Sequence, residues 1–177
     1  MVDGLTGIAN RRRLDEDMGR EWLRARRRKA MLAFILCDID HFKKVNDTYG
    51  HSVGDEVLIS LAKMLEETVR EYDIGCRYGG EEFLLIMPGA SLENAVKTAE
   101  RLLTRVMTSP VSTAKGDLSL SFSAGAAQYQ TGEEADALID RADALLVVGS
   151  SPCTPWTDTR CGPKTPTTGI DRSSWAI

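Results

Sequence analysis

Residues 31–40 read MLAFILCDID, and this stretch decides the fold. Its first part, residues 31–37, is continuously apolar and as long as a typical strand. An apolar run without alternation indicates a central strand that is covered on both faces. Asp38, Ile39 and Asp40 follow directly, so the strand is expected to carry carboxylates to one edge of a sheet.

The segments around this strand alternate between helical and strand periodicity. Helices are expected over residues 10–28, 53–70, 91–107 and 133–147, and strands over 74–78, 82–87 and 118–129. Gly79 and Gly80 are expected to join two of the strands in a hairpin, because both turn positions of a tight hairpin can need positive φ. The order of these elements predicts an α/β (α+β) fold, with helices packed against a layered sheet.

The composition is that of an ordinary globular protein. The chain has 177 residues, a formal net charge of −4 and 42% hydrophobic residues. The negative charge argues against binding a nucleic-acid polymer through bulk positive charge. No apolar run approaches the roughly 20 residues of a membrane-spanning helix, so no membrane contact by this segment is expected. The four cysteines form no CxxC pair, which argues against a zinc site and favours a cytoplasmic location.

The end of the chain has a different character. Residues 151–177 hold four of the six prolines and two of the three tryptophans, among many Ser and Thr residues and without helical or strand periodicity. Such a segment offers little to a packed core. We therefore expect one domain over residues 1–148 and an aberrant tail over 149–177, either disordered or artificial.

Two acidic residues are expected to meet at one edge of the sheet. Asp38 ends the apolar strand, and Glu81 lies in the glycine hairpin. If the hairpin pairs with the strand, the carboxylates share a cleft, where like charges repel unless a cation lies between them. Such a pair suits Mg²⁺, which leaves its other coordination positions to water and substrate phosphates. The alternative is that both acids are solvated residues at a strand end and a turn.

The segments that follow carry groups suited to a nucleotide. Backbone N–H groups of a loop that enters a helix can hold phosphate oxygens, and Lys43 could add a positive charge. Asn46 and Asp55 offer an amide and a carboxylate, a pair able to bind the edge of a guanine. Taken singly, Lys43 is also typical of a solvated surface and Asp55 of a helix N-terminus. By spacing alone, Arg70 and Asp73 are expected to form an ion pair at a helix end.

Six motifs occur in order along the chain. They are Asp3-Gly-Leu-Thr-Gly-Ile-Ala-Asn-Arg-Arg12, Asp38-Ile-Asp-His-Phe-Lys-Lys-Val-Asn-Asp47, Gly50-His-Ser-Val-Gly-Asp55, Arg77-Tyr-Gly-Gly-Glu-Glu-Phe83, Ser123-Ala-Gly125 and Ala142-Asp143. Together they resemble the catalytic domain of bacterial diguanylate cyclases, the GGDEF family, with the signature loop in its Gly-Gly-Glu-Glu-Phe form. The resemblance covers about residues 3–146.

The resemblance implies a central, mostly antiparallel sheet flanked by helices, similar to the nucleotidyl cyclase and polymerase palm fold. It also implies that the domain joins two GTP molecules into cyclic di-GMP, releases two pyrophosphates, and acts as a homodimer with one GTP on each subunit. By motif position, Asp38, Glu81 and the backbone carbonyl of Ile39 would bind Mg²⁺, or Mn²⁺ in its place. The implied catalytic residues are Glu81, Glu82 and Asp38.

The same motif positions imply two binding sites. The residues that would contact the guanine, the phosphates or the ribose of GTP are Asn46, Asp55, Lys43, His41, Phe42, Gly79 and Gly80. The residues that would bind cyclic di-GMP and mediate product inhibition are Arg70, Asp73 and Arg101.

The resemblance ends abruptly near residue 145. Such domains usually continue Ala-Leu-Tyr, then Ala-Lys, then Gly-Arg-Asn, whereas residues 144–150 read ALLVVGS. The lysine and arginine that would contact GTP phosphates are absent, and no short closing strand is expected. We interpret this as a reading-frame change or an artificial end. The chain also opens where a regulatory region normally joins, so an upstream regulatory domain is expected to be missing.

Three functions follow from these observations. The first is an active diguanylate cyclase, which the intact signature loop favours. The second is a catalytically weak module that binds cyclic di-GMP and signals by contact, which the missing terminal cations favour. The third is a cyclase that makes a 3′,5′-cyclic mononucleotide, against which the signature loop and the guanine-binding pair argue.

Overall fold

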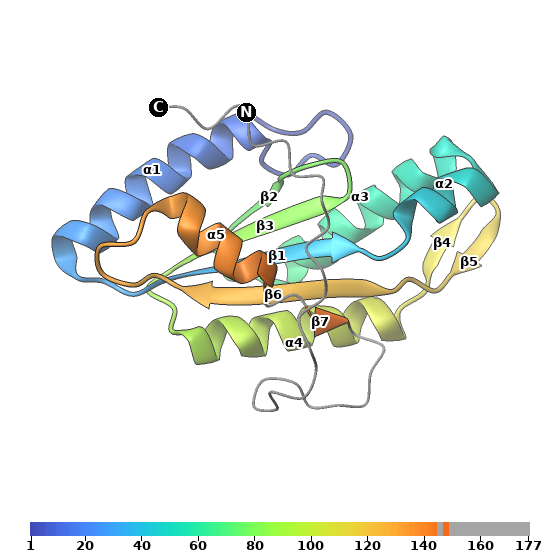
Figure 1. The fold of residues 1–177 in the computed structure, drawn as a ribbon. Helices are drawn as coiled ribbons and strands as arrows, with labels where there is room; N and C mark the ends of the chain where they lie inside the picture. Colours follow the sequence, from blue (N-terminus) through green and yellow to red (C-terminus); the bar gives the residue numbers. More distant parts are fainter. Residues whose placement is uncertain (145–146, 149–177) are drawn as a thin grey trace.

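The computed structural model describes residues 1–144 and 147–148. Its centre is a five-stranded sheet with the order β2-β3-β1-β6-β7, in which every pair is antiparallel (Figure 1). The strands of this sheet are β1 (Leu32–Ile39), β2 (Ile74–Arg77), β3 (Glu82–Pro88), β6 (Phe122–Gln128) and β7 (Val147–Val148). A second, two-stranded sheet is formed by β4 (Val111–Thr113) and β5 (Gly116–Leu118).

Five helices lie in the described residues. They are α1 (Arg11–Arg28), α2 (Phe42–Tyr49), α3 (His51–Thr68), α4 (Leu92–Thr108) and α5 (Ala135–Ala144). α1 and α4 begin at the residues that their capping side chains predict. Asn10 accepts a hydrogen bond from the N–H of Arg13 at 3.0 Å, and Ser91 accepts one from the N–H of Asn94 at 3.3 Å.

β1 is the central strand, as the apolar run predicts. It pairs with β3 on one side and with β6 on the other, and its residues from Leu32 to Cys37 are buried. The register places Asp38 opposite Glu82 on β3 and opposite Ser123 on β6. The acidic end of the strand therefore lies between the signature hairpin and the start of β6.

Alternate residues of β1 enter two different cores. Leu32, Phe34 and Leu36 pack with α1 and α5 on one face of the sheet. The residues between them pack with α3, α4 and Phe42 of α2 on the other face. Figure 1 shows these helices on both sides of the sheet. The predicted sheet with flanking helices is confirmed, and both faces of β1 are covered because its two side-chain rows are equally apolar.

The predicted hairpin between β2 and β3 is confirmed, but the expected reason for its glycines is wrong. Neither Gly79 nor Gly80 has positive φ. A Cβ at Gly79 would instead lie 2.4 Å from Oε2 of Glu82, whereas a Cβ at Gly80 would meet nothing within 4 Å. Gly79 therefore makes room for a carboxylate, and Gly80 leaves the backbone of the loop open.

Two predictions between β1 and β6 are corrected by the structure. Residues 42–49, expected as a loop, form α2, whose N-cap residue His41 makes no side-chain capping bond, so the usual sequence signal for a helix start is missing. Residues 118–129 do not form one strand, because Leu118 ends β5 and β6 begins only at Phe122. Leu118 and Leu120 pack against the core from outside the main sheet, which explains their apolar alternation without a shared strand.

The end of the described chain also differs from expectation. α5 spans Ala135–Ala144, so the helix predicted over 133–147 does not extend to Val147–Val148, which form β7. Expecting no closing strand was therefore wrong: two β-branched valines pair with Ser123 and Ala124 of β6. The predicted tail over 149–177 lies outside the described residues. Within residues 1–144 and 147–148, none of the helices combines the length and hydropathy needed to span a membrane.

Candidate functional site

Acidic side chains gather where β1 ends. Asp38 and Glu82 are directly paired on β1 and β3, and side chains of directly paired residues lie on the same face of a sheet. The N–H of Ile39 donates to the carbonyl of Glu81 at 3.4 Å, which fixes the signature loop against the end of β1. The structure therefore brings together the three predicted acids, Asp38, Glu81 and Glu82.

The charged form of Asp38 is unfavourable in this position. Burial, followed by the negative charges of Glu81, Glu82 and Asp40, raises the pKa of Asp38 to about 7. Its Oδ1 atom is buried and has no hydrogen-bond partner among the residues that the structure describes. A buried carboxylate oxygen without a donor, surrounded by like charges, is a position that a cation would stabilise.

Glu82 is held over the loop backbone. Its carboxylate occupies the space beside Gly79 that a side chain would otherwise fill. Burial raises the pKa of Glu82, the charges of Asp143 and Glu81 raise it further, and Arg11 opposes them. Asp143 comes from α5, so the acidic residue of the Ala142-Asp143 motif lies near the signature loop. Asp143 was not among the predicted site residues.

An arginine ties the signature loop to the first motif of the chain. Arg77 Nη2 donates to the carbonyl of Gly80 at 2.8 Å, and Arg77 Nη1 donates to Asp3 Oδ1 at 3.2 Å. Asp3 in turn accepts hydrogen bonds from the N–H and the hydroxyl of Thr6 at 2.9 and 2.7 Å. The N–H of Arg77 also donates to the carbonyl of Ala9 at 3.0 Å. Both motifs are visible in the sequence, but the contact between residues 74 positions apart is not.

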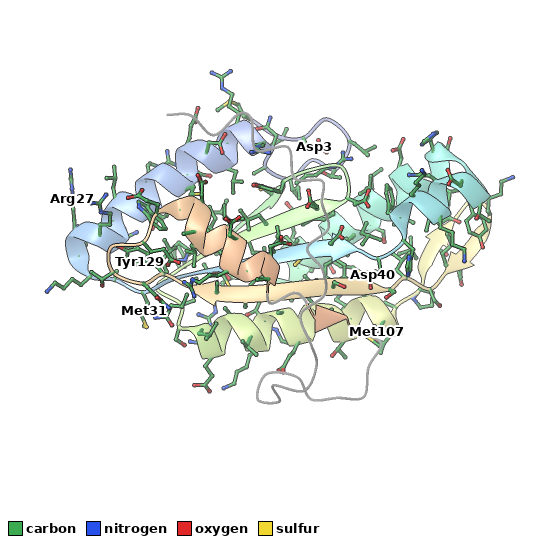
Figure 2. The ribbon with its side chains drawn as sticks, viewed as in Figure 1. Asp3, Arg27, Met31, Asp40, Met107 and Tyr129 are labelled. Atoms are coloured by element: carbon green, nitrogen blue, oxygen red, sulfur yellow. The ribbon has the colours of Figure 1, made fainter. Side chains whose placement is uncertain are left out.

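The turn from β1 into α2 places a helix N-terminus beside the acids. Only Asp40 and His41 separate the two elements, and His41 adopts a left-handed conformation with φ 58°. Figure 2 shows Asp40 near the end of β1 that leads into α2. Phe42 is buried beneath the helix, and Lys43 is exposed. A helix N-terminus with an exposed lysine in its first turn is suited to phosphate groups.

The two predicted guanine-binding residues are brought together by a glycine. A Cβ at Gly54 would lie 2.0 Å from Asn46 Oδ1 and 3.2 Å from a ring carbon of Phe42, so α2 can pack on α3 only because this position lacks a side chain. Gly54 immediately precedes Asp55, which is exposed. The half-buried amide of Asn46 therefore lies close to the backbone that carries Asp55.

The three predicted product-binding residues lie around the C-terminal end of α3. Asp73 accepts a hydrogen bond from the backbone N–H of Arg70 at 3.0 Å, so the two are joined by a turn. The Arg70–Asp73 ion pair expected from spacing does not occur among the described residues. Arg101 of α4 donates to the carbonyl of Thr68 at 2.7 Å, two positions before Arg70. Both arginines are exposed.

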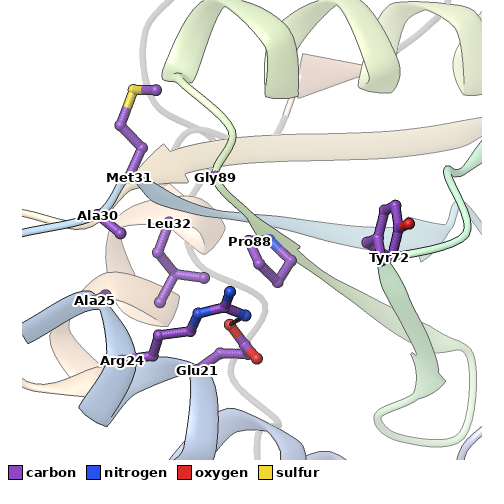
Figure 3. Close-up of a pocket in the computed structure, with 9 residues that line it drawn as sticks. All are labelled: Glu21, Arg24, Ala25, Ala30, Met31, Leu32, Tyr72, Pro88 and Gly89. Carbon is purple, nitrogen blue, oxygen red and sulfur yellow. Dashed lines mark ion pairs between the residues drawn. The ribbon is translucent and has the colours of Figure 1, made fainter. Parts of the chain in front are cut away.

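Figure 3 shows the residues around a cavity of about 330 Å³, none of which belongs to the acidic cluster. It is bordered by Leu32 at the beginning of β1 and by Pro88 at the end of β3, whereas Asp38 lies near the opposite end of β1. An ion pair between Arg24 and Glu21 lies at its wall, at 3.6 Å. None of the predicted catalytic or substrate-binding residues lines this cavity.

The predicted metal ligands at the end of β1 are all oxygen atoms. No group of three or more His, Cys, Asp or Glu side chains within the described residues is arranged to hold a metal ion. The predicted set needs only the carboxylates of Asp38 and Glu81 and the carbonyl of Ile39, and it leaves the remaining positions to the nucleotide. Oxygen donors of this kind suit Mg²⁺ and Mn²⁺, and the Asp38 oxygen without a donor fits such an ion.

Comparison with known proteins places this chain in a family. The family profile described as the GGDEF domain of diguanylate cyclases matches residues 1–148. The chain belongs to the GGDEF family. The resemblance inferred from the six motifs is thereby confirmed.

Several named GGDEF proteins are similar to this chain. The response regulator PleD of Caulobacter vibrioides is 42% identical over 146 residues, which are 81% of this chain and 32% of PleD. Diguanylate cyclase DosC of Escherichia coli is 38% identical over 148 residues, which are 83% of this chain and 32% of DosC. This GGDEF chain therefore spans about a third of the length of these relatives.

Solved GGDEF structures have the same fold. Diguanylate cyclase SiaD of Pseudomonas aeruginosa, in complex with its activator SiaC, has a TM-score of 0.77 and 40% identity, over 81% of this chain and 55% of SiaD. The GGDEF domain of DgcB from Caulobacter crescentus, in complex with c-di-GMP, has a TM-score of 0.77 and 32% identity, over 81% of this chain and 84% of that one. The predicted palm-like fold is confirmed.

Proposed function

We propose that this domain condenses two GTP molecules into cyclic di-GMP with release of two pyrophosphates. The observation that carries the proposal is the buried Asp38 oxygen without a donor, set among acids at the end of the central strand. It lies between a glycine loop open to a ligand at Gly80 and the N-terminus of α2. Membership of the GGDEF family supports the same reaction.

In this proposal Asp38, Glu81 and the carbonyl of Ile39 hold Mg²⁺, or Mn²⁺ in its place. When bound, the ion neutralises charge on the nucleotide phosphates and lowers the pKa of the attacking 3′-hydroxyl. Glu81 lies in the loop and is the residue we assign to accept the hydroxyl proton. Glu82 is packed against Gly79 and completes the acidic wall of the site.

The remaining residues bind and orient the nucleotide. The N–H groups at the start of α2, around His41 and Phe42, and the charge of Lys43 bind the β- and γ-phosphates. Asn46 and Asp55 bind the guanine edge, with Asn46 positioned against Gly54. The backbone at Gly79 and Gly80 approaches the α-phosphate and the ribose. We expect positioning of the two anions to supply much of the rate enhancement.

A homodimer follows from this arrangement. One domain presents one acidic cluster and one guanine-binding pair, whereas the reaction joins two GTP molecules. Two copies facing each other across a two-fold axis would bring each 3′-oxygen to the α-phosphorus of the other nucleotide.

Product inhibition is assigned to the end of α3. The guanidinium of Arg70 is exposed beside the Asp73 turn, and Arg101 is anchored two positions away at Thr68. Arginine forks suit phosphate and guanine acceptors, and the Asp73 carboxylate suits guanine donors. Titration of cyclic di-GMP against the wild-type chain and Arg70→Ala tests this assignment. Inhibition that is equally strong in the variant would remove it.

The activity is tested by incubating the full chain with GTP and Mg²⁺ and measuring pyrophosphate and cyclic di-GMP. We expect both products in a ratio of two to one, no cyclic mononucleotide, and loss of both in Asp38→Asn. Lys63→Gln, which removes an exposed charge on α3, serves as the control and should retain turnover. A wild-type chain that binds cyclic di-GMP but makes none would contradict the enzymatic proposal in favour of a binding module.

A further inference from the structure

Asp40 belongs to the acidic end of β1 but has no place in the proposed metal or substrate set. Its Oδ1 accepts a hydrogen bond from the hydroxyl of Ser123 at 2.6 Å, and its Oδ2 accepts one from the hydroxyl of Ser121 at 2.5 Å. Its backbone N–H donates to the carbonyl of Ser121 at 3.0 Å. Three hydrogen bonds therefore attach Asp40, the residue that follows β1, to Ser123 of β6 and to Ser121 just before β6.

These hydrogen bonds lie on the same face of the sheet as the acidic cluster around Asp38. Ser123 is the residue of β6 directly opposite Asp38, so its side chain shares the sheet face of Asp38. Ser123 is also buried, and it opens the Ser123-Ala-Gly125 motif, to which no function has been assigned above. Both Asp40 oxygens already accept hydrogen bonds from hydroxyl groups, which favours a positioning role over direct coordination of a metal ion.

The segment that Asp40 anchors is strained. The next residue, His41, has φ 58° and ψ 29°, a left-handed conformation that is unfavourable for a residue with a side chain. The carbonyl of His41 then accepts hydrogen bonds from the N–H groups of Lys44 at 2.8 Å and Val45 at 3.3 Å, which form the first turn of α2. A strained turn of this kind keeps its geometry only when its surroundings hold it.

We propose that Asp40, Ser121 and Ser123 form a clamp that positions the N-terminus of α2 relative to Asp38. The clamp fixes the left-handed turn at His41 and thereby the direction of the first N–H groups of the helix and of Lys43. Its role toward a nucleotide rests on the function proposed above, whereas its role in holding α2 does not. Asp40 acts through the turn and is a positioning residue.

Hydrogen exchange tests the clamp without reference to catalysis. The double variant Ser121→Ala, Ser123→Ala removes both hydroxyl donors and keeps the backbone of β6. In the full chain without nucleotide, we expect the amides of Lys44 and Val45 to exchange about tenfold faster, because the turn that bonds them opens more often. Ser119→Ala, an exposed serine two positions before Ser121, is the matched control and should leave exchange unchanged. Equal protection in the double variant and the control would overturn the proposal.

Nucleotide affinity tests the functional half of the inference. With Mg²⁺ and a GTP analogue that cannot be cleaved between the α- and β-phosphates, we expect the double variant to raise Kd about tenfold, at a temperature where both proteins are fully folded. The kcat at saturating GTP should stay within about threefold of wild type. Faster exchange with an unchanged Kd would reduce the clamp to a purely structural element and overturn its positioning role. If the wild-type chain does not bind the analogue, the function proposed above fails, and hydrogen exchange alone decides the clamp.

Discussion

Replacing Asp3 with Asn tests whether the signature loop is held by the first motif of the chain. Arg77 contacts Asp3 and Gly80 at once, so the carboxylate of Asp3 orients the guanidinium that binds the loop. The side chains of Arg77 and Asp3 are only 18% and 23% exposed, so water screens the pair weakly. Asn keeps the shape and an acceptor oxygen but removes the charge.

The expected loss is about 1–2 kcal/mol of unfolding free energy, since hydrogen bonds to charged groups contribute about 1.5–3 kcal/mol and Asn retains part of the contact. Glu16→Gln is the matched control, because it removes the same charge from an exposed pair, Arg12–Glu16, whose side chains are 80% and 53% exposed. For that pair the expected change is below about 0.5 kcal/mol. Urea unfolding of the full-length variants measures both values.

The difference in unfolding free energy between wild type and Asp3→Asn should depend on pH, in a direction that follows from the pKa of Asp3. Burial alone would raise the pKa of Asp3, but hydrogen bonds from Thr6 and the charge of Arg77 outweigh it, and the pKa lies below its ordinary value of 3.8. The carboxylate therefore contributes stability above pH 3.8, and this contribution is lost as the pH falls through the lower folded value. The difference between wild type and Asp3→Asn should shrink in that range. If Asp3→Asn is no less stable than Glu16→Gln at pH 7, the proposed anchoring of the loop is refuted.

Three further outcomes are expected. Glu81→Gln should lower cyclic di-GMP formation by at least about 100-fold while leaving the melting temperature close to wild type, because it removes one charge from the cluster without changing its shape; turnover within a few-fold of wild type would contradict the role of Glu81. Gly54→Ala should cost about 1–3 kcal/mol of stability and raise the KM for GTP, since the new Cβ meets Asn46 Oδ1 at 2.0 Å; Gly19→Ala, on the exposed face of α1 with nothing within 4 Å, is its control. Asp38→Asn should raise the melting temperature in EDTA at pH 8, because the negative charge of the wild-type Asp38 is unfavourable there. The same variant should lose the stabilisation by Mg²⁺ that wild type is expected to show. Equal stabilisation of both proteins by Mg²⁺ would exclude Asp38 as a ligand.

Local patterns in the sequence predict most of the sheet and of the helices that pack on it. The continuous apolar run of β1 predicts a central strand because only a strand covered on both faces can bury two rows of side chains. Caps predict the beginnings of α1 and α4 because Asn10 and Ser91 satisfy N–H groups within their own helices. Both kinds of signal depend only on residues close together in the chain.

The features that sequence reasoning misses depend on contacts between distant segments. α2 begins at a left-handed His41 without a capping side chain, so its start is set by tertiary contacts and not by a cap. The strand predicted over 118–129 fails because Leu118 and Leu120 face the core from outside the ladder. The Asp3–Arg77 and Asp40–Ser123 contacts join residues 74 and 83 positions apart, and no periodicity predicts them. Only the motifs to which these residues belong pointed to their importance.

The acidic cluster is held in place by two sets of contacts, its two supports, which do not involve the proposed metal ligands. They are the Arg77–Asp3 pair and the hydrogen bonds of Asp40 to Ser121 and Ser123. Asp38 is raised to a pKa of about 7 and keeps an oxygen without a donor, so its charged form weakens the metal-free fold near neutral pH and above it. The loop on one side is fixed by the opposite charges of Arg77 and Asp3, and the turn on the other side by neutral serine donors to Asp40. Neither support uses an oxygen of Asp38 or Glu81. In the proposed function, the ligand atoms can therefore be held in place while they remain available to a cation. We expect the loss of either support to weaken nucleotide binding before it unfolds the sheet.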